Sequence, residues 1–222
     1  MAKYTKNHTV YYNGSGTEVP SVTTILKLLN KPALVHWSNY LGFKRQNVKV
    51  VLEESASKGT SFHDIVHKYT TKEQFNITDY MKEVQNLFNL FQVWYTENDF
   101  SVIHGELSLS GDRFAGTIDA IGILNGNMII LDYKTSKNIY SSMFLQLSAY
   151  SLLIKENRPD LYTKLDGVGI LSISEKNGIQ EKYIPIDRIE KLYQPTFNSL
   201  VDIFYKWYDL NIEDWDNNIT KE

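Results

Sequence analysis

The most constraining feature of this sequence is a hairpin signal in its second half. The stretch "GTIDAIGILNGNMIILDYK", residues 116–134, places Asn125-Gly126 between two apolar runs. Asn-Gly is strongly favoured in two-residue hairpin turns, because both turn positions need a positive φ. Such a turn pairs residue 124 with residue 127, and the same register then places Asp119 directly opposite Asp132. The sequence therefore predicts two antiparallel strands that carry facing carboxylates.

These two carboxylates need a positive partner. Their Cβ atoms would lie about 4.5–5.5 Å apart in this register, and the ionised groups would repel by ~4 kcal/mol at an effective dielectric constant of about 20. Lys134 shares the face of Asp132, because side chains alternate along a strand. The cation is either Lys134 itself, in a structural ion pair at a strand end, or a divalent metal such as Mg²⁺ or Mn²⁺, which prefers oxygen ligands.

Composition excludes several classes of protein. With 222 residues, of which 42% are hydrophobic, the chain can bury one sizeable core, so we expect a single domain over residues 1–222. The absence of cysteine excludes disulfides, thiolate zinc sites and iron–sulfur clusters. The polar start "MAKYTKNHTV" and the short apolar runs predict neither a signal peptide nor a membrane span. Any metal must therefore bind to oxygen or imidazole.

Charge is distributed unevenly along the chain. Residues 1–72 hold 10 Lys/Arg and 4 Asp/Glu, a net charge of +6, whereas residues 73–222 hold 13 and 22, a net charge of −9. A basic segment can follow the phosphates of a nucleic acid, while an acidic segment can hold metal ions. The alternative is that these lysines simply solvate helix surfaces.

Hydrophobic periodicity and turn residues predict the order of the elements. Asp187 is expected to cap the last helix, whose apolar side would contain Ile189, Leu192, Phe197, Leu200, Ile203 and Phe204. We expect a hairpin and helical part over about 1–98, a catalytic-type core over about 99–210 and an acidic tail at 211–222. The individual elements are a hairpin around Asn13-Gly14, a helix capped by Ser21, two or three helices within 33–69, a helix at about 79–95, strands at 100–110, 113–124 and 128–134, a helix at 138–157, and strands at 168–174 and 178–186.

One of the early helices carries two histidines beside its apolar stripe. His63 and His67 are four residues apart, a spacing that also occurs in zinc sites, but no Glu follows His63 as that motif requires. Without further information, His63 is best interpreted as a histidine satisfied by its neighbours. The stripe itself recurs with helical spacing at Phe62, Ile65, Val66 and Tyr69.

Several motifs together resemble a known family. The hairpin stretch followed by "QLSAY" resembles the core of the PD-(D/E)XK nucleases, in the RecB-like branch that ends with a Gln-x-x-x-Tyr helix. "VPSVTTIL", "GTSFH", "GELSLSGDRFAGTIDA", "LDYKTSK" and "LQLSAY" also follow the order seen in the mitochondrial genome maintenance exonuclease and its phage relatives. The match covers most of residues 19–155, and several motifs in order are more specific than any one of them.

The resemblance implies a fold of class α/β (α+β): a restriction-endonuclease-like core with a central mixed sheet flanked by helices, and an N-terminal helical region. It implies that Asp119, Asp132 and the backbone carbonyl of Tyr133 hold Mg²⁺ or Mn²⁺, without an iron–sulfur cluster. Lys134 would orient or deprotonate the attacking water and stabilise charge on the phosphate. The other implied positions are His63 as an additional metal ligand that favours Mn²⁺, Glu106 as the acidic position of the preceding strand, and Gln146 and Tyr150 as residues that steady the lysine and the scissile phosphate.

Each of these assignments has a structural alternative. Gln146 and Tyr150 lie four residues apart on one helix face, where core packing is also common. Ser21 and Thr23 can simply cap a helix, whereas the resemblance suggests that they also contact DNA.

The function implied by the resemblance is that of a metal-dependent DNA exonuclease in replication, recombination or repair. The expected substrate is single-stranded DNA or DNA ends, with Lys44, Arg45 and Lys49 along its path. A structure-specific endonuclease of the same fold and a non-catalytic DNA-binding recombination module are the alternatives. Recombination or replication proteins are candidate partners, a membrane is not, and the expected location is the cytoplasm of a bacterial or phage-infected cell.

Overall fold

The computed structural model of the chain describes residues 10–29 and 32–214. Its centre is a five-stranded mixed sheet with the strand order β3-β4-β5-β6-β7, in which β5 and β6 are parallel and the other neighbours are antiparallel. The sheet class expected from the resemblance is therefore confirmed. The strands are β3 (Phe100–Ser110), β4 (Ala115–Leu124), β5 (Asn127–Lys134), β6 (Gly167–Ser174) and β7 (Gly178–Pro185).

Helices cover both faces of this sheet. On one face α5 (Ser141–Asn157) packs on a core that includes Ile121 and Ile130, and on the other α3 (Val48–Thr71) and α4 (Lys82–Glu97) pack on a second core that includes Leu131. Alternate residues of β5 thus enter different cores, which explains why both faces of this central strand are apolar.

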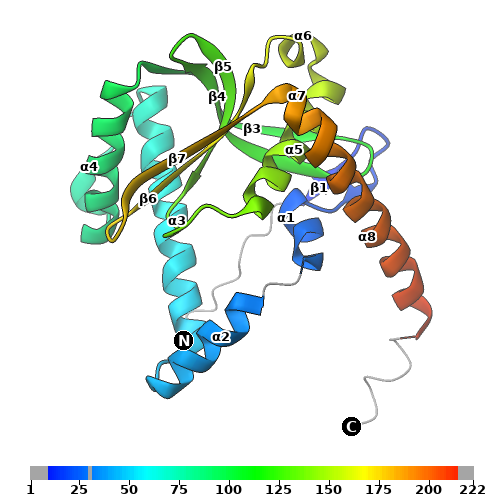
Figure 1. Ribbon diagram of the computed structural model, residues 1–222, viewed down its shortest axis with the longest axis horizontal. Helices are drawn as coiled ribbons and strands as arrows, with labels where there is room; N and C mark the ends of the chain where they lie inside the picture. Colours follow the sequence, from blue (N-terminus) through cyan, green and yellow to red (C-terminus); the bar gives the residue numbers. More distant parts are fainter. Residues whose placement is uncertain (1–9, 30–31, 215–222) are drawn as a thin grey trace.

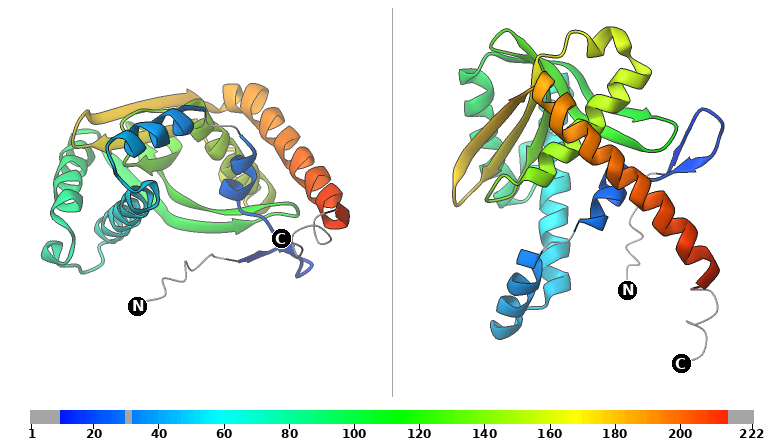
Figure 2. Two further views of the ribbon diagram at one scale, coloured as in Figure 1. Left: turned by 90° about the horizontal axis from the view of Figure 1, so that it is seen from below. Right: turned by 45° about the vertical axis from the view of Figure 1, so that its right-hand side comes forward.

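The N-terminal helices form an arm. In Figures 1 and 2, α2 (Pro32–Phe43) and the first turns of α3 extend away from the sheet. Asn47 caps α3, because its side chain accepts a hydrogen bond from the backbone N–H of Lys49 at 2.9 Å. Later turns of the same helix lie against the sheet, where Phe62, Ile65 and Val66 are fully buried. A single long helix therefore connects the arm to the centre of the fold.

The start of the described chain lies against β4. Strands β1 (Tyr11–Tyr12) and β2 (Glu18–Val19) form a small hairpin, and Ser21 caps α1 (Val22–Ile25), which continues as η1 (Leu26–Leu28). Ser21 also forms a parallel bridge with Ala115 at the start of β4. The expected hairpin and helix cap are thus present, although the α-helical part is short.

The predicted register of the central hairpin is confirmed as far as it extends. Leu124 pairs with Asn127, and the ladder continues to Ala120 and Leu131. It ends there, so the next pair along the register, Asp119 and Asp132, lies beyond the hydrogen-bonded part of the two strands.

The C-terminal helices differ from the sequence expectation. Pro185, and not Asp187, is the N-cap of α7 (Ile186–Arg188), and the π-helical turn η3 (Ile189–Tyr193) then leads into α8 (Gln194–Asp214). A π-helical turn places an extra residue in the helix, so the apolar stripe changes phase. Leu192, within this turn, is 50% exposed. Ile203, further along α8, is 52% exposed. Both differ from their expected place on the apolar side.

The remaining connections are short helices. They are η2 (Ile77–Asp79), which precedes α4, and α6 (Pro159–Tyr162), which follows α5 and was not expected. Of the predicted acidic tail, residues 211–214 belong to α8, and residues 215–222 lie outside the described residues. In the part of the chain that the structure describes, no helix combines the length and apolar character of a membrane span.

Candidate active site

The candidate site lies where β4 and β5 separate. Beyond the last ladder pair, Oδ2 of Asp119 accepts a hydrogen bond from the backbone N–H of Tyr133 at 2.9 Å. The Asp119 side chain thus takes the place of a backbone partner. The N–H and C=O of one strand residue point to the same side, so the carbonyl of Tyr133 also faces β4.

Asp132 is the most enclosed member of the site. Its side chain is 1% exposed, and its Oδ2 lies 2.5 Å from Nζ of Lys134. From α5, Nε2 of Gln146 donates hydrogen bonds to Oδ1 of Asp132 at 3.1 Å and to Oη of Tyr150 at 2.8 Å. The residues expected to cooperate with Asp132 therefore make direct contacts, and the i, i+4 spacing does place Gln146 and Tyr150 on one side of α5.

His63 enters the site from the opposite face of the sheet. Its Nδ1 lies 3.2 Å from Oδ1 of Asp119. The ring stands edge-on to the ring of Tyr133, with centroids 6.2 Å apart. Because α3 supplies His63 and α5 supplies Gln146, helices from both faces converge on the two carboxylates.

The two carboxylates have opposite electrostatic environments. Burial tends to raise the pKa of Asp119, but His63, Lys134 and the Tyr133 N–H together hold this pKa below its usual value. Burial raises the pKa of Asp132 to about 6; Lys134 opposes this rise, and the charge of Asp119 adds to it. Ionised Asp132 is thus less favourable in the fold than ionised Asp119.

The pKa values of both basic groups of the site, His63 and Lys134, are raised. Burial tends to lower the pKa of His63, yet Asp119 and Asp132 outweigh burial and raise it. Burial also tends to lower the pKa of Lys134, whereas the same two carboxylates raise it. Both groups are therefore biased toward the cationic form that balances the carboxylates.

The donor atoms fit a hard divalent cation. Among the described residues, no three His, Cys, Asp or Glu side chains form a group that could hold a metal ion. A site here therefore needs the Tyr133 carbonyl beside the oxygens of Asp119 and Asp132, and such oxygen ligands suit Mg²⁺ or Mn²⁺. Oδ2 of Asp132 is buried beside the Lys134 ammonium, and because burial and the charge of Asp119 raise the pKa of Asp132, a further cation here would favour its ionised form.

Glu106 stays at the edge of this group. It lies opposite Asp119 by the β3–β4 register, but the ladder omits this pair, and Glu106 has a positive φ of 47°. Its side chain is exposed and makes no hydrogen bond or ion pair within the described chain. A positive φ is uncommon for a residue other than glycine and marks an irregularity of β3 beside the carboxylates.

The expected DNA-binding residues lie in two other places. Ser21 and Thr23 are at the start of α1, where their hydroxyl oxygens are 3.0 Å apart. Lys44, Arg45 and Lys49 surround the turn between α2 and α3 at the tip of the arm. Lys49 precedes His63 by fourteen residues of α3, so the two lie about 21 Å apart along the helix axis.

The sequence also places the chain in a family. Residues 50–202 match the PD-(D/E)XK nuclease superfamily, so the chain belongs to that superfamily. The matched region contains His63, both aspartates, Lys134 and the Gln146–Tyr150 pair. Assignment to the RecB-like branch and to the mitochondrial exonuclease type stays a prediction. Among curated proteins, none matches the sequence.

Solved structures with some similarity include two exonuclease structures. The crystal structure of SSO0001 is 17% identical, with a TM-score of 0.41, and the alignment covers 88% of this chain and 76% of that chain. The alkaline exonuclease LHK-Exo from Laribacter hongkongensis is 10% identical, with a TM-score of 0.28, over 63% of this chain and 76% of that chain. Its complex with dAMP is 11% identical, with a TM-score of 0.28, over 69% and 84% of the two chains.

The unequal carboxylates lead to a prediction about stability. In a chelating buffer near neutral pH, we expect Asp132→Asn to melt no lower than the parent, because the pKa of about 6 corresponds to at most ~3 kcal/mol of unfavourable charge. Asp119→Asn should melt lower, because its charge is favourably placed. Thermal unfolding monitored by circular dichroism measures both differences.

The difference in melting temperature between Asp132→Asn and the parent should also depend on pH. Since the folded-state pKa of Asp132 is raised above its unfolded-state value of about 4, the parent binds an extra proton on folding between about pH 4 and pH 6. The contribution of Asp132 to the free energy of unfolding of the parent therefore falls as pH rises through that window. Any advantage of Asp132→Asn should be present above pH 6 and vanish near pH 4. A lower melting temperature for Asp132→Asn at pH 7 would contradict this account.

Proposed function

We propose that this protein is a Mg²⁺- or Mn²⁺-dependent DNA exonuclease that hydrolyses phosphodiester bonds of single-stranded DNA or DNA ends during replication, recombination or repair. The observation that supports this most strongly is the environment of Asp132. A buried carboxylate contacts Lys134 and Gln146 and lies beside Asp119, at the end of a central strand. A structural ion pair at a strand end would need neither the second carboxylate nor the Gln146–Tyr150 pair.

Each side chain has a role that follows from its contacts. Asp119, Asp132 and the Tyr133 carbonyl would hold the divalent cation, and His63, which contacts Asp119, would contribute a nitrogen ligand or position that carboxylate. When bound, such a cation polarises the phosphate and lowers the pKa of a water molecule to which it binds. Gln146 fixes the orientation of Asp132 and connects it to Tyr150.

Lys134 is the group best placed to stabilise negative charge on a bound phosphate. Its ammonium reaches the Asp132 carboxylate, and its raised pKa keeps it protonated at neutral pH. A protonated lysine has no lone pair with which to bind a metal, so it donates hydrogen bonds instead. We infer that it stabilises the negative charge that develops on the phosphate as the water attacks.

The arm supports a single-stranded substrate. Tyr40 and Phe43 are 57% and 89% exposed on α2, and unpaired bases stack on such aromatic side chains. Nζ of Lys44 lies 5.8 Å from the centre of the Tyr40 ring, which places a positive charge beside this aromatic surface. An exposed aromatic surface flanked by Lys44, Arg45 and Lys49 combines base stacking with attraction for phosphates.

Neutralising the tip of the arm should weaken DNA binding. In a variant with Lys44, Arg45 and Lys49 changed to Gln, we expect a lower affinity for single-stranded DNA. The slope of log K against log salt should flatten by up to ~0.7 for each lost phosphate contact. The cleavage rate at saturating DNA should change far less, because the tip lies about 21 Å from His63 along α3.

Fluorescence anisotropy at several salt concentrations measures this slope. The matched control changes three exposed cations at the other end of the sheet to Gln and so removes the same charge: Lys164, Arg188 and Lys191. If the slope of log K against log salt were the same for the arm variant and the parent, Lys44, Arg45 and Lys49 would not contact DNA and would simply be solvated side chains on helix surfaces.

The proposed function is tested with end-blocked substrates. Single-stranded DNA with a free 5′ end, a free 3′ end, both ends blocked, or in circular form is incubated with Mg²⁺ or Mn²⁺, and the products are sized. We expect cleavage of linear DNA with at least one free end and no cleavage in a chelator. Efficient cleavage of circular DNA would reject the exonuclease proposal and support the endonuclease alternative. If no substrate were cleaved, the non-catalytic DNA-binding module would be the remaining hypothesis.

A further inference from the structure

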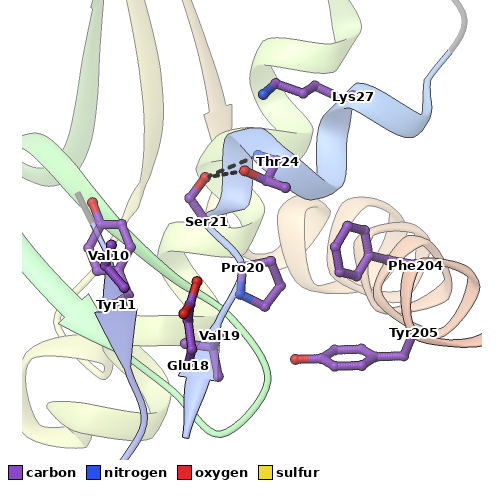
Figure 3. Close-up of a pocket in the computed structure, with 10 residues that line it drawn as sticks. All are labelled: Val10, Tyr11, Glu18, Val19, Pro20, Ser21, Thr24, Lys27, Phe204 and Tyr205. Atoms are coloured by element: carbon purple, nitrogen blue, oxygen red, sulfur yellow. Dashed lines mark hydrogen bonds between the residues drawn. The ribbon is translucent and has the colours of Figure 1, made fainter. Parts of the chain in front are cut away.

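A cavity lies beside the candidate active site, between the β1–β2 hairpin and α8. Its volume is about 550 Å³, within the range of about 300–1,000 Å³ that is usual for small-ligand sites. Figure 3 shows its lining residues, which come from the hairpin, from α1 and η1, and from α8. None of the roles assigned above uses this cavity as a whole.

Aromatic side chains form two sides of the cavity. In Figure 3, Tyr11 of the hairpin lies across the cavity from Phe204 and Tyr205 of α8. Tyr205 is held in place, because its hydroxyl donates a hydrogen bond to the backbone carbonyl of Arg113 at 2.7 Å. The guanidinium of Arg113 also lies 5.3 Å from the centre of the Tyr205 ring. Fixed aromatic walls suit a flat heteroaromatic ligand, since stacking then requires little loss of side-chain freedom.

The polar groups of the cavity favour a base over a phosphate. Ser21 and Thr24 line it with hydroxyl oxygens 2.8 Å apart, and Lys27 lies on the same side of the cavity. The exposed carboxylate of Glu18 is at the opposite side and would repel a phosphate. The same carboxylate can accept a hydrogen bond from an exocyclic amino group, which cytosine and adenine carry and thymine lacks.

One wall of the cavity contacts the strand that carries Asp119. The hydroxyl oxygen of Tyr11 lies 3.0 Å from Oγ1 of Thr117. Thr117 precedes Asp119 by two strand residues, about 7 Å along β4. On the neighbouring residue, a Cβ at Gly116 would come within 2.8 Å of Cε1 of Tyr150, so β4 packs directly against Tyr150 here. The distance from this wall to Asp119 is therefore on the order of one nucleotide.

We propose that this cavity binds the base of the nucleotide next to the scissile phosphate, and that Glu18 accepts a hydrogen bond from the amino group of that base. The inference rests on the proposed function, because it gives the nuclease a preference among single-stranded substrates. Tyr11 and the two α8 aromatics supply stacking, and Lys27 lies where it can attract the adjoining backbone.

The test compares oligo(dC) with oligo(dT) of equal length. Binding is measured by anisotropy in a chelator, and cleavage is measured separately with Mg²⁺ or Mn²⁺. We expect the parent to prefer oligo(dC) by about fivefold to tenfold in affinity, the effect of one charge-assisted hydrogen bond in a partly exposed site. Glu18→Gln should reduce this preference to less than about twofold, because an amide can pair with the amino group of cytosine or the carbonyl of thymine.

The control variant is Glu97→Gln, which removes an exposed carboxylate at the end of α4. It should retain the parental preference. Equal affinity of the parent for both oligonucleotides, or a preference for oligo(dC) that persists in Glu18→Gln, would contradict the proposed base-binding role of the cavity. Cleavage of both oligonucleotides without any base preference would leave the proposed nuclease intact and reject only the pocket, whereas a preference in binding without cleavage would support the pocket and reject the nuclease.

Discussion

Asp132→Asn and Asp119→Asn are each expected to reduce DNA cleavage by ~10³-fold or more, the scale observed when one member of a catalytic set is removed. Asp132 lies buried between Lys134 and Gln146, and Asp119 accepts the Tyr133 N–H. An amide in either position keeps the size of the side chain but removes the negative charge that a divalent cation needs. Cleavage of labelled single-stranded DNA at saturating substrate, with Mg²⁺ and with Mn²⁺, gives the rates.

A DNA-binding measurement and a control variant show whether the loss of cleavage is specific to the metal site. Binding of single-stranded DNA in a chelator should stay close to that of the parent, because the arm that carries the basic residues is unchanged. Glu106→Gln should cost far less than either aspartate substitution, because the Glu106 side chain is exposed and makes no hydrogen bond or ion pair within the described chain. If either aspartate variant cleaved DNA at the parental rate, the metal site would lie elsewhere in the protein.

The sequence predicted the central hairpin well because local chemistry specifies it. Asn125 and Gly126 have φ angles of 49° and 84°, the positive values that the tight turn requires. The two-residue turn then fixes the register, because it pairs Leu124 with Asn127. The register in turn predicted that the two aspartates approach each other.

The separation of the strands at Asp119 could not be predicted in the same way. It depends on contacts from distant segments: His63 on α3, and the irregular backbone of Glu106 on β3. No local pattern indicates a positive φ at a glutamate in a strand. The expected single apolar stripe from Ile189 to Phe204 was misleading for a related reason, because the π-helical turn at Ile189–Tyr193 has no clear sequence signal.

The catalytic roles were predicted from the order of several motifs, and not from any one residue. His63 alone resembles an ordinary histidine beside an apolar stripe, and only the fold brings it to Asp119. The cavity beside the site was missed entirely, because its walls come from both ends of the chain, with Glu18 in the hairpin and Phe204 in α8. The turn residues of "VYYNGSGTEV" predicted that hairpin, but nothing in them indicates which helix covers it.

Lys134→Ala is expected to retain DNA binding while losing ~10²-fold or more in cleavage rate, by comparison with other lost charge-stabilising donors. Lys134 contacts Asp132 directly, so its loss also removes the cation nearest to that carboxylate. Metal binding should persist, because no ligand atom is removed. Parental cleavage by Lys134→Ala would reject the nuclease assignment of β5 and favour the binding-module alternative.

An arginine at position 134 separates two roles for the lysine. A neutral lysine could take a proton from the attacking water, whereas a protonated lysine stabilises charge on the phosphate. The carboxylates raise the pKa of Lys134 against the effect of burial, so the cation is the form that the fold favours. Arginine keeps the charge but cannot act as a base at neutral pH. We therefore expect Lys134→Arg to cleave labelled single-stranded DNA substantially faster than Lys134→Ala at pH 7 and saturating substrate. An arginine variant as slow as the alanine variant, with an unchanged melting temperature, would favour proton abstraction by Lys134 over electrostatic stabilisation.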